Sequence, residues 1–208
     1  MKKFSSFLIL LALLMSAATS VSGQVRFGVK AGLNLANISG DITDTKMNPT
    51  FMVGGQAEFG LSDALGLGVG LQLHGKGFKI DLDGENATSS PLYIQVPVYL
   101  MYRNSGFFGG VGPYVGFGVG GKSKFSGESQ SISFGSTVDD DFSSLDFGAG
   151  LELGYEFGSL RASASYNLGL SNVIPKDAAS GFDISARHNV IGIALAYLFG
   201  GGMVGLQF

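Results

Sequence analysis

Hydrophobic and polar positions alternate along most of the chain with a period of two. Between Leu92 and Arg103, leucine, isoleucine, valine and tyrosine occupy every second position, and the alternation resumes between Phe107 and Val119. Successive side chains of a β-strand point to opposite faces, so this period is typical of strands with unlike faces. The residues between the two stretches, Asn104 to Gly106, tolerate the backbone angles of a tight turn. The segment therefore predicts a β-hairpin.

The second face of this hairpin is unusual for a soluble protein. Between positions 107 and 119 it consists mainly of glycine and tyrosine, and charged residues make up only 14% of the chain, against roughly a quarter in soluble domains. The outward face of a soluble barrel has to be well hydrated. A membrane barrel has the reverse arrangement, with apolar side chains facing lipid and small or polar ones facing a narrow interior. The pattern favours the membrane barrel.

The same alternation occurs in eight stretches, each about as long as a tilted membrane strand of roughly 9–11 residues. They are residues 25–37, 51–61, 65–76, 92–103, 107–119, 147–156, 160–169 and a last stretch that ends at 199. Short connections at 62–64, 104–106 and 158–159 alternate with long polar ones at 38–50, 81–91, 121–144 and 171–187. We therefore predict an all-β fold, an eight-stranded antiparallel up-and-down transmembrane β-barrel with short periplasmic turns and long extracellular loops.

The first 23 residues have the composition of a cleaved signal peptide. Lys2 and Lys3 precede an apolar run over 7–15, which is too short to span a bilayer, and small residues follow. Cleavage before Gln24 gives an exported chain with the barrel at 24–199 and a short tail at 200–208. The chain has no cysteine, which excludes disulfides and a lipid-anchored cysteine. Its net charge of −3 and lack of a basic cluster argue against nucleic-acid binding.

Charged residues of both signs fall on the predicted inward face. They are Arg26, Lys30, Glu58, Lys76, Arg103, Glu152, Glu156 and Arg161. Eight strands enclose an interior only just wide enough for side chains, and charges buried there have to pair. We therefore predict a polar lumen network that plugs the barrel. The many inward glycines leave volume that water could fill, so a narrow pore is the alternative.

Three motifs suggest other chemistry, and their context argues against it. Residues 116–123 match the phosphate-binding pattern G-x-x-x-x-G-K-[ST], but no helical pattern follows them. The acidic stretches at 81–86 and 139–141 lack the full spacing of a calcium loop and are interpreted as solvated loops. The two histidines, His74 and His188, have no diagnostic spacing to a serine such as Ser185. We therefore predict no enzyme activity, no cofactor and no metal site.

The mature chain resembles the PorT-like, or porin-family, outer-membrane β-barrel family of Gram-negative bacteria. The resemblance is carried by Phe27 to Asn34, Ile94 to Leu100, Asp146 to Gly150, Tyr166 to Asn172 and Tyr197 to Phe199. It implies the fold, an outer-membrane location, and a strand-end aromatic that the barrel-assembly machinery recognises. Phe199 is the favoured candidate for that aromatic, with Phe208 as the alternative. Within strand 92–103, Pro97 has no N–H and predicts a bulge or local bend.

The sequence thus predicts a monomeric outer-membrane protein, embedded in lipid, that acts as a structural or surface-interaction scaffold through its four long loops. The ligand or protein partner of these loops stays open. A narrow small-solute or ion channel and an accessory role in protein secretion are the alternatives. A soluble lipocalin-like binder is the remaining class.

Overall fold

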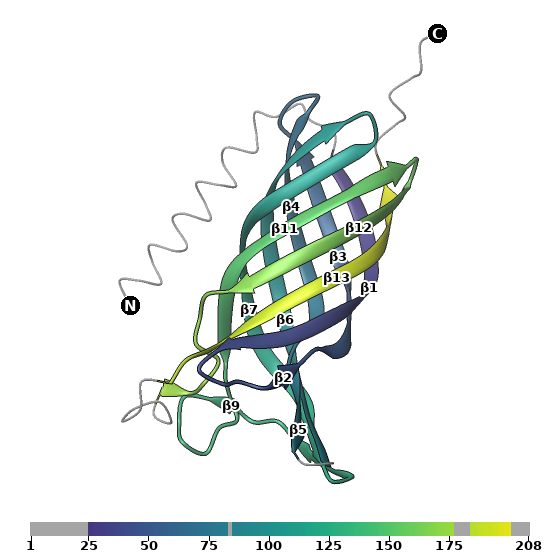
Figure 1. Ribbon diagram of the computed structural model, residues 1–208. Coiled ribbons are helices and arrows are strands. Elements are labelled where there is room, and N and C mark those ends of the chain that lie inside the picture. Colours follow the sequence, from purple (N-terminus) through teal and green to yellow (C-terminus); the bar gives the residue numbers. More distant parts are fainter. Residues whose placement is uncertain (1–24, 83–84, 177–183, 201–208) are drawn as a thin grey trace, which may run out of the picture.

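The computed structural model describes residues 25–82, 85–176 and 184–200, which form a closed antiparallel β-barrel (Figure 1). Eight strands make the ring, and β1 closes it by pairing with β13. They are β1 (Val25–Gly40), β3 (Asn48–Gly60), β4 (Leu65–Gly75), β6 (Glu85–Asn104), β7 (Phe107–Phe125), β11 (Leu145–Phe157), β12 (Leu160–Gly169) and β13 (Ala186–Phe199). The predicted eight-stranded fold is confirmed. The predicted signal peptide and residues 201–208 of the predicted tail lie outside the described residues.

The two faces of the wall have the predicted polarity. Large apolar side chains such as Phe27, Leu100 and Leu195 are exposed on the outside, whereas Lys30, Gln95 and other polar residues are buried inside. This is the arrangement that lipid on one side and a narrow polar interior on the other require. Among the described residues there is no helix long and apolar enough to cross a membrane.

The tight connections lie at one end of the barrel, together with the start of β1 and the end of β13 (Figure 1). We call this end the turn end. The long connections gather at the opposite, loop end, where β6 and β7 continue past the ring. Five short strands lie in these connections: β2 (Thr45–Lys46), β5 (Phe78–Leu82), β8 (Glu128–Ser131), β9 (Phe134–Gly135) and β10 (Phe142–Ser143). Three of them extend β6 and β7 into what we call the distal sheet, with the order β2-β5-β6-β7-β8.

The prediction that residues 81–91 and 121–144 are loops is therefore partly wrong. Residues 85–91 belong to β6 and residues 121–125 to β7, which are 20 and 19 residues long. These segments pair with each other through their backbones, but their sequences show no alternation of apolar and polar residues. The criterion that found the membrane strands could not find this extension.

The predicted bulge at Pro97 is also wrong. Pairing between β6 and β7 keeps one register from Tyr93 opposite Gly118 to Asn104 opposite Phe107, and the shift lies at Leu92/Tyr93 instead. Beside Pro97 both ladders are interrupted without a change of register, at residues 70–71 of β4 and at residues 112–113 of β7, because a missing N–H removes a hydrogen bond without requiring an extra residue. At the observed bulge Val119 is the extra residue, since Leu92 pairs with Gly120. Beyond this bulge, the even-numbered residues of β7 face outward and the odd-numbered residues face inward, the reverse of the arrangement before it.

Candidate functional site

The lumen near the turn end contains a cluster of arginines and glutamates. Cross-strand pairing sets Arg26 beside Glu58 and Glu156 beside Arg161. Arg26 donates to Glu58 at 2.7 Å and, across the lumen, to Glu156 at 2.8 Å, and Arg161 donates to both glutamates. Arg103 lies 3.8 Å from Glu58. Glu58 is the centre of the cluster, because its carboxylate, 2% exposed, faces all three arginines.

The middle of the lumen is filled by an ion pair and by aromatic rings. Lys30 donates to Glu152 at 2.6 Å, and both side chains are buried. The Tyr99 hydroxyl occupies the place that a Cβ on Gly150 would take, and the Tyr114 ring lies 2.8 Å from a Cβ built on Gly148. These two inward glycines thus make room for tyrosines rather than for water.

A second buried ion pair, between Lys76 and Asp146, crosses the lumen below the loop end. Both side chains are buried, at 0% and 1% exposure. The Lys76 ammonium lies 4.3 Å from the centre of the Tyr114 ring, and the Ser171 hydroxyl donates to Asp146 at 2.6 Å. Asp146 was not among the predicted lumen residues. It shares the inward phase of Gly148, Gly150 and Glu152, so extending the predicted strand at 147–156 by one residue would have included it.

Apolar residues from the long connections and from the adjoining ends of β1 and β13 close the loop end, and we call this cluster the cap. It consists of Ile38, Ile132, Phe142, Val173 and Ala186, with Ile42, Phe78, Phe134 and Ile174 packed against it. The Phe142 ring stacks on buried His188 with centroids 6.1 Å apart, and the Phe134 ring packs on Tyr93 at 5.3 Å. Backbone hydrogen bonds of 2.8 Å join Ser143 to Val173 and Val173 to Ala186. Two connections far apart in sequence therefore form one layer over the lumen.

The space between these layers includes a small cavity. A lumen cavity bordered by Glu58, Gln72, Tyr99, Glu152 and Arg161 has a volume of about 20 Å³. One water molecule needs roughly 10–15 Å³ of such volume, so the cavity has room for about one.

The eight predicted lumen residues lie inside the barrel, and each makes at least one ion pair.

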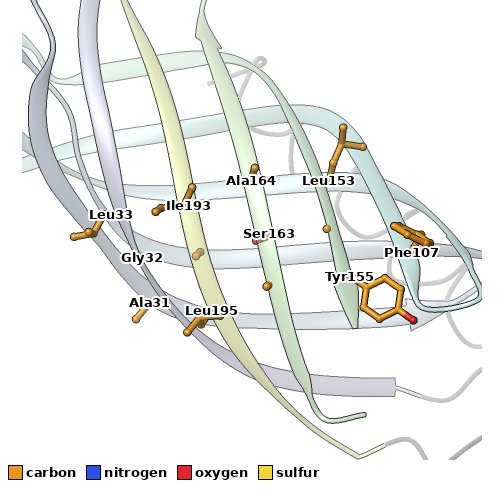
Figure 2. A pocket seen from close by; sticks show the side chains of 13 residues that line it. Ala31, Gly32, Leu33, Phe107, Leu153, Tyr155, Ser163, Ala164, Ile193 and Leu195 are labelled. Carbon is orange, nitrogen blue, oxygen red and sulfur yellow. The ribbon is translucent and has the colours of Figure 1, made fainter. Parts of the chain in front are cut away.

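The outer wall carries a shallow groove of about 790 Å³ (Figure 2). Its lining includes the small residues Ala31, Ala162 and Ala164 and larger side chains of β11 and β13. Leu153, Tyr155, Ile193 and Leu195 are among these borders. The groove follows from short side chains on a lipid-facing wall, and its lining is almost entirely apolar.

The structure does not assemble the motifs that suggested other chemistry. Residues 116–123 lie within the continuous strand β7, so they form no phosphate-binding loop. Ser185 bonds to Asp41, with its N–H at 2.7 Å and its hydroxyl at 3.2 Å, whereas neither ring nitrogen of His188 has a hydrogen-bond partner in the described part of the chain. A serine–histidine pair for catalysis is therefore not formed there.

The acidic run at 139–141 holds its own loop together. Asp140 accepts from the Thr137 hydroxyl at 2.6 Å and from the Thr137 N–H at 2.9 Å, and these hydrogen bonds lower the pKa of its carboxyl. Asp141 accepts from the Ser133 N–H at 2.8 Å. Within the described ranges, no group of three or more histidine, cysteine or acidic residues is arranged to hold a metal ion.

Comparison with known proteins agrees with this architecture. Residues 16–175 match the family model described as outer membrane protein beta-barrel domain. Ail of Yersinia pestis, solved with the heparin analogue sucrose octasulfate, is 16% identical, with a TM-score of 0.46 over 85% of this chain and 99% of that one. Neisserial surface protein A is 12% identical, with a TM-score of 0.47 over 83% and 97%. Outer membrane protein W of E. coli is 15% identical, with a TM-score of 0.31 over 86% and 100%. No curated protein is significantly similar in sequence.

Proposed function

Because the chain belongs to the outer membrane protein beta-barrel domain family, we propose that it is a surface-interaction scaffold of the outer membrane. In this proposal the barrel is a rigid support, and its loop end faces the exterior. The observation that carries it is the combination of a filled lumen with strands β6 and β7 that continue beyond the ring into the distal sheet. The filled interior leaves no wide path for a solute, whereas the extended strands add surface beyond the ring.

The distal sheet is the surface best suited to contact a partner. All four residues of its outer strand β8, Glu128–Ser131, are exposed, and among the described strands β8 pairs with β7 alone. An edge strand presents unpaired backbone groups, and the polar side chains of β8 keep it soluble. The chemistry of the partner is left open by these side chains, so the proposal concerns the surface and not a named ligand.

The orientation of the barrel gives a direct test, since the chain has no native cysteine. We expect Gln130→Cys, in β8, to react with a membrane-impermeant maleimide on intact cells. Ser159→Cys, in the exposed tight turn between β11 and β12, is the matched control and is expected to react only after the outer membrane is permeabilised. Labelling of Ser159→Cys alone on intact cells would contradict the proposal.

The channel alternative predicts a different electrical behaviour. We expect the mature chain, folded into a planar bilayer, to give no discrete conductance steps, because ion pairs cross the lumen at three levels and the cap covers them. Folding is checked by the heat-dependent shift in gel mobility. Reproducible steps that change in Glu152→Gln or Arg161→Gln would instead make the protein a narrow channel.

Further features of the sequence support finer proposals. The PorT-like motifs favour an accessory role in secretion. If deletion of this chain abolished secretion of another protein, and the barrel gave no conductance, that role would be supported.

Strand β13 ends at Phe199, which pairs with Phe27 at the turn end, and we propose Phe199 as the residue that the barrel-assembly machinery recognises. Slower membrane insertion of Phe199→Ala would support that role.

We also propose that the barrel is a monomer. The mass of the protein in detergent, measured after subtracting the bound detergent, tests this proposal.

A further inference from the structure

We infer that lysines on the outward face of the distal sheet form a binding site for the phosphate groups of an outer-leaflet lipid. The site consists of Lys79 on β5 with Lys122 and Lys124 on β7. It goes beyond the proposed scaffold function, because it concerns the membrane around the barrel and not a partner in solution.

The strand register places these lysines on one face. Lys46 pairs with Lys79, Lys79 with Thr88, Thr88 with Lys124, and Lys124 with Ser129, so one row crosses all five strands of the distal sheet. Residues directly opposite each other in antiparallel strands project from the same face. Lys122 lies two residues from Lys124 and opposite Ser90, and therefore projects from this face as well.

The bulge at Val119 decides which face this is. Up to Gly118 the even-numbered residues of β7 face the lumen, as Phe108 and Tyr114 do. After the bulge, Gly120 pairs with Leu92, which lies on the outward phase of β6. Lys122 and Lys124 are consequently exposed on the outer side, in line with the lipid-facing wall. Without the extra residue both lysines would point toward the cap.

The height of the row corresponds to a lipid headgroup region. The outward apolar positions of β6 run from Tyr102 to Leu92, a span of 102 − 92 = 10 residues. At about 3.3 Å per residue and a tilt of about 40°, this span covers roughly 25 Å along the membrane normal, the height of the apolar band in such barrels. Ser90 and Lys122 form the next row outward, and Thr88 and Lys124 the row after that. Long lysine side chains at this level can reach phosphate groups while their stems stay near the apolar wall.

The charge of the face fits an anionic ligand. Lys46 is paired with Asp81, whereas Lys79, Lys122 and Lys124 make no ion pair within the described ranges. Glu128 lies opposite Phe125, so it projects from the other face of the sheet. These three lysines, which have no carboxylate partner among the described residues, form a local positive surface at the membrane border in a chain of net charge −3. Lipid phosphate is the ligand present at that border at high local concentration.

Binding is tested with the folded protein in zwitterionic detergent. Native mass spectrometry measures how much bis-phosphorylated lipid A is retained, compared with enzymatically dephosphorylated lipid A. We expect retention of the phosphorylated form only. The triple variant Lys79→Gln/Lys122→Gln/Lys124→Gln is expected to bind it about fivefold more weakly for each charge removed, hence on the order of 100-fold more weakly in all.

The controls separate charge at this site from other causes of weaker binding. The variant Lys79→Arg/Lys122→Arg/Lys124→Arg keeps the charges and is expected to bind as the unsubstituted protein does. Lys176→Gln removes an exposed lysine from another connection and is expected to have no effect. Equal binding by the triple glutamine variant, or equal retention of dephosphorylated lipid A, would overturn the inference. Binding of heparin without binding of lipid A would overturn it too, because the ligand would then be a soluble polyanion.

Discussion

Replacing Glu58 with glutamine is expected to destabilise the barrel by about 3–5 kcal/mol, the usual cost of removing one partner from a buried ion pair. The Glu58 carboxylate accepts from Arg26 at 2.7 Å and from Arg161, and Arg103 lies 3.8 Å away. In Glu58→Gln, Arg26 and Arg161 keep only the carboxylate of Glu156, and Arg103 loses its ion pair. The amide of glutamine is nearly the same size, so the loss reports on charge and not on packing.

The free energy of unfolding in lipid vesicles measures this effect, with urea as denaturant and the gel-mobility shift as the signal for folded barrel. Glu128→Gln removes the same charge from exposed strand β8 and is expected to change the free energy by less than about 0.5 kcal/mol. A loss below about 1 kcal/mol in Glu58→Gln would mean that water screens the cluster, and the ion-pair plug would then be wrong.

The membrane-spanning part of the fold could be predicted from the sequence because its signal is local. Alternation such as that of Leu65, Leu67 and Val69 with glycines depends only on neighbouring residues, and lipid on one face makes it strict. The distal sheet was missed because Thr88, Ser89 and Ser90 lie beyond the apolar band of the wall, where neither face of a strand has to be apolar.

The partners within the lumen could not be predicted, although the inward phase could. Lys76 and Asp146 are 70 residues apart, and only the closed ring and its register bring them together. The inward glycines were interpreted as open volume, but Tyr99 and Tyr114 from other strands occupy that volume. The bulge at Leu92/Tyr93 has no marker in the sequence, whereas Pro97 gave a false one. Contacts across a barrel depend on three-dimensional closure, which periodicity does not contain.

Asp146→Asn is expected to destabilise the protein by about 3–5 kcal/mol, because it leaves the Lys76 ammonium buried without a counter-charge. The Tyr114 ring, 4.3 Å from that ammonium, stabilises a cation only in part. Asp146 also accepts from the Ser171 hydroxyl at 2.6 Å, so its loss is expected to loosen the connection between β12 and β13 as well. Urea unfolding in vesicles measures the first effect, and proteolysis of the loop end measures the second.

Removing both charges of this pair is expected to have the opposite outcome. In Lys76→Met/Asp146→Leu no charge is buried, and apolar replacement of a buried ion pair is often neutral or stabilising by about 1–4 kcal/mol. The double variant should therefore be more stable than Asp146→Asn alone, although it changes one more residue. If instead the losses of the single variants Lys76→Met and Asp146→Leu simply add in the double variant, the two side chains do not interact, and the loop end is held by the apolar cap and not by the ion pair beneath it. A strongly non-additive result would show that Lys76, which follows β4, and Asp146 in β11 interact across the lumen.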